Sequence, residues 1–466
     1  MNKNNIIGFV LMAAVLIGYG IWSQPSAEQK AAQKRQDSIE NVARVKAENA
    51  AKLAAQQKTA QAKAAAEADT TALFHAALKG NATNVVLKNN DVELTLNTKG
   101  GVVTKAVIKN FDDRNGNNYV TLFDDKTQSL NFAIAAKTVN INTADLYFTP
   151  SNQTDSTVTM TAAAGNGKSL VINYVLGKDY MLHTQIQAVG LGNDFAPSTD
   201  RMDVQWKELA RQQERGFTFE NRYASLTYHK TDGGTDYLSE AKSVTDEAIE
   251  EKIDWVAFKN QFFSAVMIAK NDFAENASLS SIPQEKGSGY LKQYEAKMKT
   301  FFDPSGKTPS EFDFYFGPND FRLLNRVEKE CQFNKDLEMQ RLVYLGWPLF
   351  RIINRWFTIY VFDFLTGLNI NMGIVLILIT LLLKIITYPM VKKSYMSSAK
   401  MRVLKPKLEE ATKHLNKPED QMQKQQAMMA EYAKYGVSPL SGCLPMLIQM
   451  PIWIAMFNFV PNAIQL

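Results

Sequence analysis

Hydrophobic and polar residues follow four successive patterns along this chain. Residues Ile6 to Trp22 form an uncharged apolar run, and residues 27–68 contain no Gly or Pro and are rich in Ala, Gln and Lys. Short segments of alternating apolar and polar residues then extend from Asn84 to Pro318, after which apolar residues recur at helical spacing. These patterns predict a membrane anchor, a helical spacer, a β domain and a helical C-terminal part.

The first apolar run is compatible with a signal peptide or with an uncleaved membrane anchor. Its seventeen residues exceed the ~7 to 15 of a signal peptide's apolar core, and Tyr19, Ile21 and Trp22 stand where a signal peptidase prefers small residues. We therefore expect an N-terminal transmembrane anchor over residues 1–24, cytoplasmic at its start, and a helical linker over residues 25–83. A coiled coil is the alternative for the linker, but its apolar residues are too sparse to sustain heptads.

The β domain is predicted from segments of alternating residues that Gly and Asn turns separate. One segment holds Val92, Leu94 and Leu96, and a later one holds Phe312, Phe314 and Phe316. Such alternation is typical of antiparallel strands that bury one face, so we expect a large antiparallel β-sandwich. A helical pattern from Pro318 to Leu345 then completes a predicted domain of residues 84–345.

Residues 347–365 combine large apolar residues with the cations Arg351 and Arg355. The two arginines are four residues apart and therefore lie on one face of a helix. We expect this helix to lie in the membrane interface, with the arginines toward the headgroups and four aromatic residues toward the acyl chains: Trp347, Phe350, Trp356 and Phe357. The alternative is an ordinary amphipathic helix packed on the β domain.

Residues 372–391 form a predicted membrane span, because twenty helical residues extend roughly 30 Å. Its one charged residue is Lys384, and Thr380 and Thr387 lie four residues before it and three after it, on the same helix face. A charge at the centre of a span costs about 2.5 to 3.5 kcal/mol unless it faces protein or water. We interpret this stripe as the lining of a polar cavity, the alternative being a lysine that extends to the headgroups.

Charge is unevenly distributed, although the net charge of the whole chain is only +5. The polar loop of residues 392–441 holds ten Lys and Arg residues against five Asp and Glu residues. Because positive charge accumulates in cytoplasmic loops, we expect this loop to be cytoplasmic. An odd number of spans then separates it from the β domain, which is therefore predicted to be periplasmic.

The same loop has the apolar spacing of a helical hairpin. The first helix presents Met401, Leu404, Leu408, Ala411 and Leu415, and the second presents Met422, Met429 and Ala433. The first set follows the alternating spacing of a coiled-coil seam, and Asn416-Lys417-Pro418 is expected to break the helix. A second span is predicted over residues 443–462, in which Gln449 and Asn458 suit a helix that faces a wet interior.

Composition and motifs narrow the classes of function. A mean hydropathy of −0.23 excludes a chain that is mostly transmembrane. The only cysteines, Cys331 and Cys443, fall toward opposite sides of the membrane in the predicted topology, which leaves neither a disulfide framework nor a four-ligand metal site. The sequence has no Walker A string or dinucleotide fingerprint, and its four histidines form no HExxH motif.

Several strings resemble the YidC family of membrane protein insertases from about Asn84 to the end of the chain. They are LTLNTKGG at residues 94–101, YFGP at 315–318, Thr380-x3-Lys384-x3-Tyr388-Pro389, KMRVLKPKL at 400–408 and SPLSGCLPMLIQMPIW at 438–453. The resemblance implies a multi-domain protein: a periplasmic antiparallel β-supersandwich, plus an α-helical transmembrane insertase core with a cytoplasmic helical hairpin. It also implies a hydrophilic groove in that core, open to the cytosol and to lipid.

The resemblance also assigns roles to residues by position. Lys384, Thr380 and Gln449 match groove-lining residues, whereas Met450, Pro451 and Trp453 match a surface that contacts a client's transmembrane segment. The family usually has arginine at the position of Lys384, and lysine keeps the charge but loses the planar fork that grips a carboxylate. Within residues 346–466 we recognise two of the family's five core helices, so the remaining core helices are expected to be absent from this sequence.

The function implied by the resemblance is that of a non-enzymatic insertase and chaperone in the bacterial inner membrane, with no cofactor and no small-molecule substrate. The implied partners are nascent membrane protein clients, the Sec translocon, the ribosome and the lipid bilayer. On the hairpin, a basic surface suits ribosomal RNA or anionic lipid: Lys400, Arg402, Lys405 and Lys407. Two alternatives are a membrane-tethered periplasmic protein that binds or modifies carbohydrate, and a pure scaffold for the Sec translocon.

Overall fold

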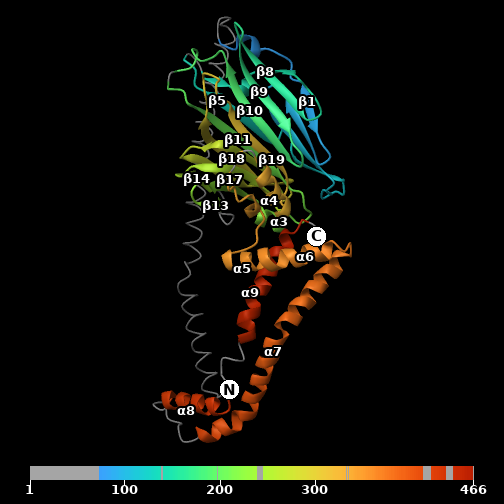
Figure 1. The fold of residues 1–466 in the computed structure, drawn as a ribbon, viewed down its shortest axis with the longest axis vertical. Helices are drawn as coiled ribbons and strands as arrows, with labels where there is room; N and C mark the ends of the chain where they lie inside the picture. The colour runs from blue at the N-terminus through green and yellow to red at the C-terminus, as the bar shows by residue number, and fades with distance from the viewer. Residues whose placement is uncertain are drawn as a thin grey trace, which may run out of the picture. The chain divides into compact units, whose positions relative to one another are not determined.

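The structure, a computed structural model, describes residues 73–137, 140–196, 198–238, 245–331, 333, 335–412, 421–436 and 444–464 (Figure 1). The predicted anchor, most of the predicted linker, the helix break at residues 416–418 and Cys443 lie outside the described residues. Residues 76–466 form one compact unit.

The β domain consists, among the described residues, of a small and a large antiparallel sheet. The small sheet has the order β1-β2-β3-β4, with β1 (Asn84–Lys88), β2 (Val92–Asn97), β3 (Val102–Lys109) and β4 (Tyr119–Phe123). The main path of the large sheet is β6-β5-β11-β18-β16-β19-β10-β9-β8-β7. Strand β15 pairs with β12 and β16, and β17 pairs with β14 and β18. The predicted antiparallel β-sandwich is thereby confirmed.

The strands of the large sheet have the following bounds: β5 (Gln128–Ile134), β6 (Ile141–Asn142), β7 (Thr149–Ser151), β8 (Thr157–Gly165), β9 (Lys168–Leu176), β10 (Met181–Val189), β11 (Arg201–Arg211), β12 (Ser225–Lys230), β13 (Gly234–Tyr237), β14 (Thr245–Ile249), β15 (Ile253–Lys259), β16 (Phe263–Phe273), β17 (Ala277–Pro283), β18 (Tyr290–Phe301) and β19 (Ser310–Pro318). A short helix, α3 (Phe217–Tyr223), joins β11 to β12. The 3-10 turns η1 (His75–Leu78) and η2 (Thr143–Asp145) lie before β1 and after β6.

Burial of alternate side chains drives these strands together. Strand β2 alternates buried and half-buried residues along its whole length, whereas every residue of β15 is buried. In the core, Trp206 stacks on Phe258 with the ring centroids 4.0 Å apart, and Phe258 in turn lies 5.3 Å from the ring of Tyr294. Large aromatic side chains like these supply most of the buried apolar area that offsets the loss of chain entropy.

The predicted helix from Pro318 to Leu345 is wrong in its second half. Helix α4 (Phe321–Glu330) begins where the Asp320 carboxylate accepts a hydrogen bond from the Leu323 N–H at 2.7 Å, and it ends at Glu330. The Glu328 carboxylate then accepts three backbone N–H groups of the following loop, those of Leu337, Glu338 and Met339. Because the Glu328 carboxylate accepts these N–H groups, the loop backbone has hydrogen-bond partners without forming a helix. The short turn η3 (Met339–Leu342) follows.

A partly buried ionic cluster fixes the same loop to the large sheet. Lys335 Nζ pairs with the carboxylate of Asp272 and, at 2.9 Å, with that of Asp254. Asp254 also bonds to His229 Nδ1 at 2.9 Å. Burial alone would raise the pKa of Asp254, but hydrogen bonds from His229 and Lys335 lower it to about 2. The loop is therefore held by long-range contacts that its own sequence pattern does not reveal.

The C-terminal part is helical and begins with a segment that we call the interfacial segment, residues 348–366. It comprises α5 (Pro348–Ile353), the π-helix η4 (Asn354–Thr358) and α6 (Ile359–Thr366). Three longer helices follow: α7 (Met372–Ala411), α8 (Gln421–Lys434) and α9 (Leu444–Phe459), which ends in the turn η7 (Val460–Asn462). Among the described helices, α7 is the one long and apolar enough to cross a membrane.

The hairpin contacts correct one sequence prediction. Leu404 and Leu408 of α7 are buried as predicted, but they pack against Met428 and Tyr432 of α8. Met422 and Met429, the predicted opposing stripe, are 73% and 64% exposed. The predicted stripe is therefore out of phase with the face that packs, because short helices with scattered apolar residues define their buried face weakly.

We expect Gly306→Ala to destabilise the β domain more than Gly167→Ala does. Both glycines have positive φ, +72° and +75°, so both substitutions carry a conformational cost of roughly 1 to 2 kcal/mol. Only at Gly306 would the added Cβ meet backbone, 1.8 Å from the carbonyl oxygen of Ala188. Urea unfolding of the detergent-solubilised protein should show an additional loss of about 1 to 3 kcal/mol for Gly306→Ala. Equal losses for the two variants would contradict the close approach.

We expect His183 to stabilise the protein more at acidic than at alkaline pH. Its Nδ1 lies 2.5 Å from Oδ1 of Asp313 on the paired strand, and this hydrogen bond raises the pKa of His183 above 6.5, against the opposing effect of burial. A raised folded-state pKa gives stabilisation that is complete below the unfolded pKa and is lost as the pH rises through the folded value.

The measurement is the unfolding free energy of His183→Gln relative to the unsubstituted protein between pH 6 and pH 9. The variant should lose about 1.5 to 3 kcal/mol at the acidic end, and the loss should shrink as the pH rises. Gln185→Ala, an exposed change on the same strand, serves as the control. A loss that grows with pH would show that the neutral imidazole makes the stabilising contact.

Candidate functional site

Helix α7 presents one buried stripe along its apolar half. Val375, Ile379, Leu383 and Thr387 follow one another at intervals of four residues, and each is at most 5% exposed. Residues on the other faces are mostly exposed, and they are large and apolar: Ile374, Ile377, Leu378, Leu381, Ile385, Ile386 and Tyr388. The helix therefore packs on its neighbours through a narrow strip and leaves a broad apolar surface for lipid or another apolar chain.

The two threonines of α7 satisfy their hydroxyl groups within the helix itself. Thr380 Oγ1 donates to the Leu376 carbonyl and Thr387 Oγ1 to the Leu383 carbonyl, both at 2.8 Å. This back-bonding to the residue four positions earlier is the usual solution for threonine in an apolar helix. The alignment of threonines therefore does not by itself require water.

An amide links α7 to α9 at the predicted site. Gln449 Nε2 donates to Thr387 Oγ1 at 3.3 Å, so the structure brings Gln449 together with the threonine that follows Lys384 by three residues. Thr380 is half-buried one turn before Lys384, whose side chain is exposed. Thus a hydrogen bond between Gln449 and Thr387 links the two helices, while Lys384 is exposed on the adjacent strip of α7.

The predicted client-contact residues share one face of α9 only in part. Met450 and Trp453 are 49% and 45% exposed, and Phe457 continues the same face at 66%. Pro451 is half-buried inside the helix, on a different face. Phe457 was missed at the sequence level, although its spacing of four residues from Trp453 places it on the same helix face.

Buried polar contacts attach α9 to the interfacial segment and to the β domain. Asn354, fully buried in the π-helix, donates from Nδ2 to the Leu345 carbonyl at 3.1 Å and to the Ala455 carbonyl at 2.8 Å. Gln261, from the loop after β15, donates to the Pro461 carbonyl at 2.5 Å. The candidate site is thus placed by long-range hydrogen bonds as well as by apolar packing.

The interfacial segment and Trp347, which directly precedes it, expose an apolar strip that differs from the predicted one. Trp347 and Trp356 are 74% and 72% exposed, but Phe350 and Phe357 are half-buried. The strip continues instead through Leu349, Ile352, Tyr360 and Phe364. A π-helix carries one more residue per hydrogen-bonded turn than an α-helix, so it shifts the phase of the residues that follow it.

The predicted basic surface of the hairpin is exposed. Lys400, Arg402, Lys405 and Lys407 all have exposed side chains on α7. Lys407 Nζ donates to Tyr435 Oη at 3.3 Å and lies 5.1 Å from the centre of that ring, which joins α7 to the end of α8. Within the described part of the chain, no group of three or more His, Cys, Asp or Glu side chains is arranged to hold a metal ion.

Comparison with known proteins identifies the two parts of the chain. Residues 84–360 match the family described as YidC periplasmic domain, and residues 364–466 match the family described as 60Kd inner membrane protein. The membrane protein insertase YidC of Phocaeicola vulgatus is 49% identical over 469 residues, which cover 100% of this chain and 74% of that protein. A Bacteroides fragilis protein of the same name is 46% identical over 468 residues, covering 100% of this chain and 75% of its own.

A distant likeness is confined to half of the chain. A galactose mutarotase-like protein from Lactobacillus casei matches with a TM-score of 0.34 and 11% identity, over 50% of this chain and 100% of its own.

The large β-sandwich and the apolar helix, together with these matches, define a non-enzymatic protein of the bacterial inner membrane that inserts other proteins into the bilayer. The chain belongs to the YidC family of membrane protein insertases.

Proposed function

We propose that this chain inserts its clients through a hydrophilic groove lined by Lys384, Thr380 and Gln449. The observation that supports the proposal is the Gln449–Thr387 contact, which places a polar amide between two otherwise apolar helices beside an exposed lysine. A client's polar tail enters the groove and so crosses a thinner hydrophobic layer. Its apolar segment then partitions into lipid, which supplies the driving force.

Lys384 acts in this proposal as an electrostatic attractor for acidic residues in the client's tail. Two unit charges 4 Å apart interact by roughly 4 kcal/mol at an effective dielectric constant of 20, against about 1 kcal/mol in water. Lysine offers a point charge where arginine would offer a planar fork, so attraction rather than bidentate binding is the role that fits this chain.

The client's transmembrane segment leaves the groove along α9 in this scheme. Met450 and Trp453 offer it an exposed apolar face, which Phe457 extends, and Pro451 shapes the helix between them. Methionine suits a surface that must accept many apolar sequences, because its side chain is flexible and polarizable.

The proposed topology has a cytoplasmic N-terminus, a periplasmic β domain and several membrane spans. The excess of positive charge in residues 392–441 supports a cytoplasmic hairpin, with α7 crossing the membrane before it. We further propose the domain limits 1–24, 25–83, 84–345 and 346–466, the last divided into an interfacial helix (347–365), a span (372–391), the hairpin (392–441) and a second span (443–462). The exposed basic residues of the hairpin would contact the ribosome, and the insertase would act alone or with the Sec translocon.

Charge reversal at Lys384 tests the groove. We expect Lys384→Glu to slow insertion of a client with an acidic tail about tenfold or more, because about 1.4 kcal/mol of lost attraction is a factor of ten. Lys384→Ala should have a smaller effect and Lys384→Arg little effect. The measurement is protease protection of the client in proteoliposomes that contain the full-length protein.

The matched control is the same client with its acidic tail residues replaced by Asn and Gln. The three variants should insert this neutral client equally well. Undiminished insertion of the acidic client by Lys384→Glu would remove the electrostatic role of the lysine.

Crosslinking from α9 tests the client surface with a matched pair of methionines. A photoreactive residue at position 450, which is 49% exposed, should crosslink to a stalled client, and one at position 457 should do the same. A probe at Met456, which is 8% exposed on the same helix, should not. The products are measured on gels after irradiation. Equal yields from positions 450 and 456 would rule out a client surface on the exposed face.

A further inference from the structure

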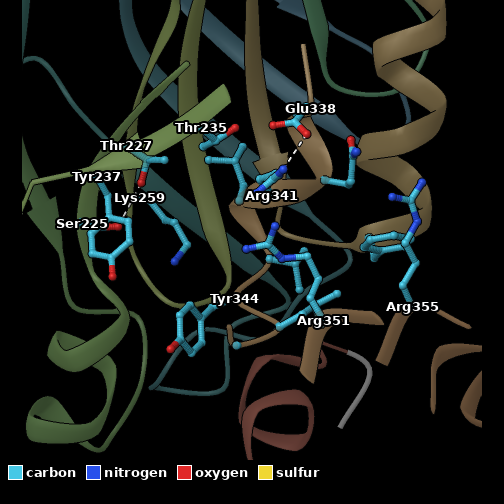
Figure 2. Close-up of a pocket in the computed structure, with 16 residues that line it drawn as sticks. Ser225, Thr227, Thr235, Tyr237, Lys259, Glu338, Arg341, Tyr344, Arg351 and Arg355 are labelled. Carbon is cyan, nitrogen blue, oxygen red and sulfur yellow. Dashed lines mark hydrogen bonds and ion pairs between the residues drawn. The ribbon is translucent and has the colours of Figure 1, made fainter. Parts of the chain in front are cut away.

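A polar pocket of about 190 Å³ lies where the β domain meets the start of the interfacial segment. Residues of β12 and β13 form one wall, and the loop of residues 338–346 forms another together with α5 and η4. In Figure 2 the Arg351 side chain points into this pocket toward Arg341, and Arg355 lies at its edge. The groove proposed above has no residue in common with the pocket.

The pocket carries positive charge that its own carboxylate balances only in part. Arg341 Nη2 pairs with Glu338 Oε1 at 2.7 Å. Arg351 and Arg355 are four residues apart and bring two more guanidinium groups to the same pocket. Burial and the nearby charge of Arg341 lower the pKa of Arg351, although an arginine remains protonated in a protein. An anion in the pocket would relieve this repulsion.

Three residues that line the pocket also have side-chain oxygens that are buried and make no hydrogen bond. Among the described residues, Glu338 Oε2, Gln340 Oε1 and Thr235 Oγ1 are buried without a hydrogen-bond partner. His229 Nε2 lies 4.0 Å from Glu338 Oε2, which is beyond hydrogen-bonding distance. Buried acceptors without partners destabilise a protein, so a ligand that brings hydrogen-bond donors would be favoured here.

The surroundings of the pocket indicate where such a ligand comes from. Arg351 and Arg355 belong to the segment whose opposite side is the exposed apolar strip that includes Leu349, Ile352 and Trp356. Amphipathic helices of this kind lie at the boundary between headgroups and acyl chains. A lipid with its chains along the strip has its phosphate at the level of the two arginines.

We propose that this pocket binds the headgroup of a glycerophospholipid whose phosphate carries a hydrogen-bond-donating substituent, ethanolamine or glycerol. Arg351 and Arg355 bind the phosphate oxygens, for which the planar guanidinium is well suited. The ammonium or hydroxyl groups of the substituent donate to Glu338 and Gln340. Choline has neither N–H nor O–H, so phosphatidylcholine satisfies the arginines but not the acceptors.

The test is calorimetric titration of the purified full-length protein with short-chain lipids below their micelle concentration. The probes are the dihexanoyl forms of phosphatidylethanolamine, phosphatidylglycerol and phosphatidylcholine, together with inorganic phosphate. We expect the first two to bind about tenfold more tightly than phosphatidylcholine or inorganic phosphate. The double variant Arg351→Gln with Arg355→Gln should weaken binding of phosphatidylethanolamine and of phosphatidylglycerol by about tenfold or more. Gln340→Leu should reduce the ratio of these two affinities to the affinity for phosphatidylcholine.

Arg201→Gln is the control matched to Arg355→Gln alone, because each removes one exposed arginine charge and Arg201 lies on β11 outside the pocket. Arg355→Gln alone keeps the test valid if changes at the half-buried Arg351 impair folding, since Arg355 is exposed. Unfolding midpoints without ligand verify the fold of each variant.

Three outcomes would overturn the proposal. Inorganic phosphate that binds as tightly as the lipids would identify a site for free anions. Phosphatidylcholine that binds as tightly as phosphatidylethanolamine would show that the acceptors take no part. Equal weakening by Arg201→Gln and by the pocket variants would reduce the effect to general charge attraction.

Discussion

The buried amide of Asn354 is the contact on which the helical part of this insertase depends. One side chain donates both to the loop that leaves the β domain, at Leu345, and to α9, at Ala455. A buried amide without partners would cost about 1 to 3 kcal/mol, so these two carbonyls constrain each other's position. The π-helix that carries Asn354 also rotates the residues after it, and so affects the positions of Tyr360 and Phe364 on the exposed strip.

The polar residues of α7 and α9 differ in the hydrogen-bond partners that they require from outside their own helix. The hydroxyl groups of Thr380 and Thr387 donate to carbonyls of their own helix, so these residues are compatible with lipid as well as with a hydrated groove. Lys384 and Gln449 have no such local solution, because an ammonium and an amide carry more donors than nearby helix carbonyls accept. These two side chains and the hydrogen bond from Gln449 to Thr387 therefore favour a hydrophilic groove, whereas the two threonines by themselves do not.

Sequence patterns predicted the elements in which one face is clearly apolar. They failed where contacts between residues far apart in the sequence determine the local structure. The alternating residues of β2 and the apolar length of α7 were sufficient, because the burial of one face or of the whole segment specifies each of them. The loop after Glu330 was predicted to be helical, because the sequence pattern does not show that the Glu328 carboxylate accepts hydrogen bonds from the loop backbone. At the site, Phe457 was predictable from spacing, whereas the partnership of Gln449 with Thr387 joins residues 62 positions apart.

The segment between Leu345 and Arg355 takes part in both the pocket and the attachment of α9. Gly346 has a φ of +86°, and a Cβ there would lie 2.4 Å from Nδ2 of Asn458 on α9, so the close approach of loop and helix requires glycine. The same glycine lines the polar pocket together with Arg351. A ligand that orders this segment from the pocket side therefore also orders the helix that carries Met450 and Trp453. The proposed headgroup pocket and the helix that carries the proposed client surface therefore both contact this one short stretch of chain.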